Sequence, residues 1–126
     1  MTEKKKNVLI IEDEKMLSEM YKTKFEMEGF EVTQAFDGKE GLDKARQGKP
    51  DIILLDIILP KLDGFLVLKE IKSDAVMKKT PVLLLTNLGQ DDDIKKGKEL
   101  GAEGYFVKSN HSPAEIVEQV RQQLKK

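Results

Sequence analysis

Five polar side chains suited to phosphate or metal chemistry follow directly after short apolar segments of this sequence. They are Glu12, Asp13, Asp56, Thr86 and Lys108. Three carboxylates in one crevice repel one another, and a hard divalent cation such as Mg²⁺ relieves that repulsion. A lysine and a hydroxyl are suited to holding phosphate oxygens. With Asp56 as the nucleophile, these are the parts that phosphoryl transfer onto a carboxylate requires.

Each of these residues also has a structural interpretation when it is taken alone. Asp56 can cap the turn that follows it, and Thr86 can bond its own backbone. Glu12 and Asp13 can cap the helix that comes next, and Lys108 can be a solvated loop lysine. Phosphoryl transfer is nevertheless favoured, because polar residues of these types stand at the ends of four of the five predicted strands.

The elements that position these side chains alternate between strand and helix along the whole chain. Segments that are apolar throughout, such as 52–55, predict strands buried on both faces of a sheet. The predicted strands are 7–11, 30–36, 52–55, 81–85 and 105–107. Apolar residues at helical spacing, as in the stripe of Leu17, Met20, Tyr21 and Phe25, predict helices between them. The first predicted helix stops at Gly29. The next three cover 39–47, 64–72 and about 91–100, and the last starts at Ser112 with a capping box.

This alternation predicts an α/β fold in which helices cover both faces of one parallel sheet through right-handed crossovers. The common doubly wound order for five strands is 2-1-3-4-5. That order places strand two at an edge, as its polar residues indicate, with Val32 as its expected core residue. Because the carboxyl ends of parallel strands share one rim, we expect the polar side chains to meet there.

Composition narrows the possible classes of function. The chain has 126 residues, and its 22 Lys+Arg against 23 Asp+Glu indicate neither a nucleic-acid nor a membrane-binding surface. The absence of cysteine excludes disulfides and thiolate metal sites. With no visible signal peptide or membrane span, a cytoplasmic protein is expected. Residues 1–6 are predicted to be a flexible lead and residues 7–126 one domain.

The sequence resembles the receiver domain of two-component response regulators from Val8 to about Leu124. The resemblance rests on an acidic pair after the first strand, an aspartate followed by proline and glycine, and the threonine and lysine after strands four and five. The matching residues are Glu12, Asp13, Asp56, Pro60, Gly64, Thr86 and Lys108. It implies a flavodoxin-like fold with five helices.

The resemblance also implies a role for each matching residue. Asp56 would be the phosphoacceptor. Mg²⁺ would be bound directly by Asp13 and Asp56, through water by Glu12, and by the backbone carbonyl of Ile58. Thr86 and Lys108 would contact the phosphoryl group itself.

Three further residues would respond to the phosphoryl group, and two of them, Thr86 and Tyr105, would transmit the signal. Thr86 and Lys108 would hold the phosphoryl oxygens. Tyr105 would be the switch aromatic that turns inward as the Thr86 hydroxyl moves toward phosphate. A half-buried sheet aromatic is the alternative interpretation of Tyr105.

Three positions depart from the family pattern. Asn87 stands after the threonine where a small residue is usual, and is expected to crowd access to the acyl phosphate. Ile58 cannot position an attacking water by a side-chain hydrogen bond, which predicts slow self-dephosphorylation. Ser109 stands where the family has a cis proline after the lysine, so the Lys108–Ser109 peptide is either strained cis or trans.

The resemblance implies a phosphorylation-dependent switch, whose only chemistry is phosphoryl transfer onto its own aspartate and slow autodephosphorylation. The donor would be a histidine kinase or a His-containing phosphotransfer protein. The output would be a downstream protein or an attached domain, reached through the face of helix four, strand five and helix five. We expect a monomer or a weak phosphorylation-dependent dimer, either free-standing or part of a longer regulator.

Other functional classes fit the sequence less well. A phosphate-independent interaction module is the main alternative. A phosphatase of the haloacid-dehalogenase type would need a second aspartate where Ile58 stands. Flavin binding would need a Ser/Thr/Gly phosphate loop after the first strand, where Glu12 and Asp13 stand instead.

Overall fold

The apolar segments form the strands of one parallel sheet in the computed structural model, which describes residues 4–126. The strands are β1 (Asn7–Ile11), β2 (Glu31–Ala35), β3 (Ile52–Leu55), β4 (Val82–Thr86) and β5 (Gly104–Val107). Their order is β2-β1-β3-β4-β5 and every neighbouring pair is parallel, which confirms the predicted doubly wound topology. The polar strand β2 lies at an edge, as predicted.

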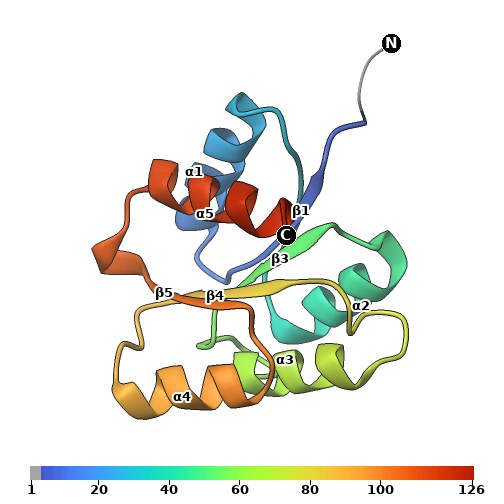
Figure 1. Ribbon diagram of the computed structural model, residues 1–126, viewed down its shortest axis with the longest axis vertical. Helices are drawn as coiled ribbons and strands as arrows, with labels where there is room; N and C mark the ends of the chain where they lie inside the picture. The colour runs from blue at the N-terminus through green and yellow to red at the C-terminus, as the bar shows by residue number, and fades with distance from the viewer. Residues whose placement is uncertain (1–3) are drawn as a thin grey trace.

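Helices cover both faces of the sheet. They are α1 (Lys15–Met27), α2 (Gly38–Gly48), α3 (Gly64–Ser73), α4 (Asp91–Glu99) and α5 (Pro113–Leu124), with a short 3₁₀ turn at Lys108–Asn110. Figure 1 shows α1 and α5 on one side of the strands and α2, α3 and α4 on the other. The predicted capping box forms at the start of α5, where Ser112 and Glu115 each accept a hydrogen bond from the other's backbone N–H.

Alternating residues of the inner strands fill two separate cores. In β1, Leu9 and Ile11 face the α2–α3 side, whereas Val8 and Ile10 face the α1–α5 side. This alternation follows from the two-residue period of a strand. Because both faces are covered, these strands read as continuous apolar runs in the sequence.

One residue of the predicted apolar stripe lies outside the core, and the predicted core residue of β2 is only partly buried. Met20 in α1 is 43% exposed, whereas Ser18 is fully buried and accepts a hydrogen bond from the Gln34 side chain at 2.8 Å. In β2 the buried residue is Ala35, and Val32 is half-buried because an edge strand is only partly covered.

The limits of β4, Val82–Thr86, lie one residue after the predicted ones. Residues 1–3 of the predicted lead lie outside the described residues, and Lys4, Lys5 and Lys6 are exposed. β4 extends to Thr86, which pairs with Val107 of β5. Within residues 4–126, no helix has the length and apolar character needed to cross a membrane.

Candidate functional site

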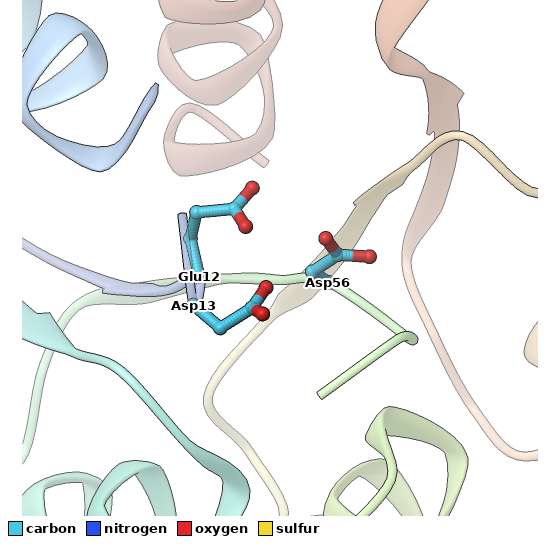
Figure 2. A group of neighbouring side chains, drawn as sticks. All are labelled: Glu12, Asp13 and Asp56. Atoms are coloured by element: carbon cyan, nitrogen blue, oxygen red, sulfur yellow. The ribbon is translucent and has the colours of Figure 1, made fainter. Parts of the chain in front are cut away.

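The carboxyl ends of β1 and β3 bring three acids together. Ile11 pairs with Leu55, so the residues that follow them, Glu12 and Asp56, leave the sheet at the same level. One carboxylate oxygen from each of Glu12, Asp13 and Asp56 lies within 4.8 Å of the other two (Figure 2). Glu12 and Asp56 are buried and Asp13 is exposed, so the cluster opens to solvent at Asp13.

Lys108 reaches this acidic cluster from the end of β5. Its Nζ donates to Asp56 Oδ2 at 2.7 Å and also to Glu12 Oε1. The three side chains are only 9%, 8% and 5% exposed, for Lys108, Asp56 and Glu12 in that order. All peptide bonds of residues 4–126 are trans, so the Lys108–Ser109 peptide is trans and the lysine is still directed at Asp56.

Burial and ion pairing act in opposite directions on these groups. Burial raises the pKa of the Glu12 carboxyl, and the hydrogen bonds from Lys108 and the Glu14 N–H only partly offset that rise. Burial alone would lower the pKa of Lys108, but the hydrogen bonds to Asp56 and Glu12 outweigh it, so the pKa of Lys108 is raised. Lys108 therefore stays protonated at neutral pH and holds a positive charge between two buried carboxyl groups.

Thr86 lies at the same rim but does not bond the acidic cluster. It is fully buried, and its hydroxyl accepts a 3.4 Å hydrogen bond from the Leu88 N–H. This is the backbone bonding that a turn threonine commonly makes.

Tyr105 is half-buried in β5 and packs against the core on the α2–α3 side. Its hydroxyl donates to the carbonyl of Leu88, the residue whose N–H bonds Thr86. One peptide segment therefore joins the two positions assigned to the switch. Leu88 was not singled out from the sequence, because its contribution comes from its backbone and leaves no mark in the residue type.

Two other predicted positions lie next to site residues: Ile58 beside Asp56 and Asn87 beside Thr86. The Ile58 N–H donates to Asp56 Oδ1 at 3.2 Å, so the Ile58 backbone borders the carboxylate while its side chain is exposed. Asn87 is exposed next to Thr86. The Ile58 carbonyl as a metal ligand and Asn87 as an obstacle to access stay predictions.

We expect both tyrosines of the chain, Tyr21 and Tyr105, to resist ionisation in the folded protein. Burial raises the pKa of Tyr21. Burial, with smaller contributions from Asp93 and Asp56, raises the pKa of Tyr105 to about 12. A raised phenol pKa means that the folded state holds the proton more tightly than the unfolded chain. The resulting stabilisation is complete below pH ~10 and is lost as the pH rises through the folded value.

Ultraviolet absorbance of phenolate measures this directly. Native protein at pH ~10 should show less phenolate than urea-unfolded protein, which should be about half ionised at the same pH. Half-ionisation of the tyrosines in the native protein at that pH would contradict the burial of the two rings.

Comparison with known proteins identifies the family. A family model described as the response regulator receiver domain matches residues 8–121. The probable transcriptional regulator ycf27 of Guillardia theta is 40% identical over 124 residues, which are 98% of this chain and 47% of that protein. The alkaline phosphatase synthesis transcriptional regulatory protein PhoP of Bacillus subtilis is 38% identical over 121 residues, which are 96% of this chain and 49% of that protein.

A solved structure shows the same architecture. A putative response regulator from Chloroflexus aurantiacus has a TM-score of 0.91 at 31% identity, with 98% of this chain and 100% of that chain covered. This chain spans about half the length of the curated relatives that it matches. From the matched residues and the shared fold, the chain belongs to the receiver domain family of response regulators.

Proposed function

We propose that Asp56 is the phosphoacceptor of this receiver domain. An Asp56 carboxylate oxygen attacks the phosphorus of the donor, the new O–P bond forms, and the bond from phosphorus to the donor breaks with its electron pair leaving on the donor. The observation that carries this proposal is the position of Asp56, which is buried at the open rim with Lys108 Nζ 2.7 Å from one oxygen. From this position the Lys108 ammonium group can bond the phosphoryl oxygens once they are attached to Asp56.

The acidic cluster fits Mg²⁺, which prefers oxygen ligands and few direct carboxylates. Asp13 and Asp56 would bind it directly, Glu12 through water and Ile58 through its carbonyl. When bound, the metal would neutralise charge between the carboxylate and the incoming phosphoryl group. The exposed Asp13 supports this assignment, since it leaves one side of the cluster accessible to a hydrated ion.

The proposal is tested by incubating the chain with acetyl phosphate and Mg²⁺ and measuring the intact mass. We expect addition of a single phosphoryl group with Mg²⁺ and none when EDTA replaces it. A chain that gains no phosphate under either condition is not a phosphoacceptor and would instead be a phosphate-independent interaction module.

We propose that the signal leaves through protein contacts at α4, β5 and α5. The Thr86 hydroxyl and the Tyr105 hydroxyl both bond Leu88, so movement of Thr86 toward a phosphoryl group would free one end of that connection. The relatives named transcriptional regulators are about twice as long as this chain, which supports control of a further domain or partner protein.

An exposed apolar surface on α1 and the start of α5 is a suitable place for the phosphodonor to dock. Met16, Met20 and Met27 of α1 line it together with Pro113, at the start of α5. Met16 is 88% exposed and follows Asp13 by only three positions, so a protein seated there would lie beside the acidic cluster. Methionine side chains adapt to the shape of a partner, which suits such a surface.

We expect Met16→Glu to slow phosphoryl transfer from a histidine kinase about tenfold, which corresponds to roughly 1.4 kcal/mol of lost binding. Transfer from acetyl phosphate should be unchanged, because that donor needs no docking surface. The matched control is Val76→Glu, which alters an apolar residue that is 64% exposed after α3. Equal slowing with both donors would place the effect of Met16→Glu in the chemistry instead.

We expect Ile58→Asn to speed loss of the phosphoryl group roughly three- to tenfold, because the amide can orient water and one such hydrogen bond is worth about 0.5–1.5 kcal/mol. The measurement is the decay of phosphorylated chain after the donor is removed. Ile58→Val is the control, since it alters the side chain without adding a polar group. If Ile58→Asn decays no faster than Ile58→Val, Ile58 does not limit hydrolysis.

A further inference from the structure

The middle of α4 contains a glycine where a stronger helix former would be expected. Gly97 is the one residue of this helix that is buried. Glycine weakens a helix interior relative to alanine, so a buried glycine there indicates that a side chain would not fit.

A Cβ atom at Gly97 would collide with Leu84 and would lie in tight contact with the ring of Tyr105. It would lie 2.6 Å from Leu84 Cδ1, and 3.1 Å and 3.5 Å from Cδ2 and Cε2 of Tyr105. Leu84 of β4 and Tyr105 of β5 are paired across the sheet. Leu84 Cδ1 and the edge of the tyrosine ring therefore together border the space that the missing side chain leaves.

This placement joins α4 to the Thr86 end of β4. With its ring against Gly97, Tyr105 donates its hydroxyl to the Leu88 carbonyl, and the Leu88 N–H bonds Thr86 at 3.4 Å. Other side chains also anchor α4: Ile94 is half-buried, Leu100 at its C-terminal end packs against the core, and Lys96 lies 4.5 Å from the centre of the Phe65 ring. The contact of Gly97 with Leu84 and Tyr105 is the one made by the buried residue of this helix.

We propose that Gly97 is a positioning residue for Tyr105, whose ring it seats so that α4 is coupled through Leu88 to Thr86. The coupling to Thr86 rests on the proposed function, because it matters only if Thr86 meets a phosphoryl group. The position of the Tyr105 ring against Gly97 does not depend on that function. A side chain at this position should shift the ring, and should weaken the response of α4 to phosphorylation of Asp56.

The seating is tested by measuring ionisation of Tyr105 in a Tyr21→Phe background, which leaves one tyrosine. The phenol of the parent should ionise near the raised value of about 12. In Gly97→Ala the ring must give way by a few tenths of an ångström, so we expect it to be more exposed and its midpoint to fall below that of the parent. The control is Gly48→Ala in α2, where an added Cβ meets nothing within 4 Å, and its midpoint should equal that of the parent. Equal midpoints for Gly97→Ala and Gly48→Ala would overturn the proposal.

A second variant separates the role of Tyr105 from that of Leu84. Leu84→Val removes the Cδ1 atom that is closest to the added methyl, so Leu84→Val/Gly97→Ala should fold with less strain and still show the lowered midpoint. A return to the parent midpoint would mean that Gly97 accommodates Leu84 only, and the proposal would fail.

Phosphorylation of Gly97→Ala separates the role of Gly97 from the role of Asp56 as phosphoacceptor. With acetyl phosphate and Mg²⁺, Gly97→Ala should gain as much phosphate as the parent, but its Tyr105 absorbance should no longer respond to phosphorylation. An unchanged Tyr105 response would overturn the coupling. If the parent itself takes up no phosphate, the proposed function and the coupling to Thr86 fail together, and the titration still decides whether Gly97 seats the ring.

Discussion

Replacing Lys108 with methionine should lower the free energy of unfolding by about 3–5 kcal/mol, since removing one partner from a buried ion pair leaves an uncompensated charge. Methionine keeps most of the length of the side chain and removes the charge. Glu12 and Asp56 would then face each other without the cation that bonds both of them. The same change should slow phosphoryl transfer, because no other described side chain of opposite charge bonds Asp56.

Urea unfolding at pH 7 in EDTA measures this loss, with Lys98→Met as the matched control. Lys98 is an exposed lysine of α4, and its replacement should change stability by no more than about 0.5 kcal/mol. Added Mg²⁺ should restore part of the stability of Lys108→Met, since a divalent cation also neutralises the carboxylates. Equal stability of the two variants would show that the ion pairs at Lys108 do not hold the acidic cluster together.

Replacing Gly64 with alanine should also have a large effect, because the start of α3 approaches the backbone of the phosphoacceptor closely. A Cβ at Gly64 would lie 2.3 Å from the Asp56 carbonyl oxygen and 2.4 Å from Ile57 Cα. Both atoms belong to the backbone, so no flexible side chain can move aside. We expect a loss of about 3 kcal/mol, at the upper end of overpacking effects, together with slower phosphorylation as Asp56 is displaced.

Unfolding and acetyl phosphate incorporation should be measured on the same preparation of Gly64→Ala. Gly48→Ala is the control, because its added Cβ has no neighbour within 4 Å and only the helix end is altered. If Gly64→Ala matches Gly48→Ala in both stability and phosphorylation, the turn after β3 does not fix the position of Asp56.

Much of this fold could be predicted from the sequence because the strands are short apolar segments bounded by polar or turn residues. The observed limits of β1 and β3 equal the predicted ones for this reason. The position of the acids could be predicted as well, since parallel strands deliver the residues that follow them to one rim.

Other features could not be predicted, because they depend on contacts between distant segments. The apolar residues of α1 surround more than one face, so helical spacing alone could not separate buried Tyr21 from exposed Met20. Leu88 acts through its backbone, and Gly97 is explained only by the ring of Tyr105 on a neighbouring strand.

The role of Asp56 is tested most directly by locating the phosphorylated residue. The chain is phosphorylated with acetyl phosphate and Mg²⁺ and reduced with borohydride, which converts an aspartyl phosphate to homoserine, and its peptides are sequenced by mass spectrometry. We expect homoserine at position 56 and no incorporation in Asp56→Asn. Homoserine at another acid such as Asp13, or unchanged incorporation in Asp56→Asn, would contradict it.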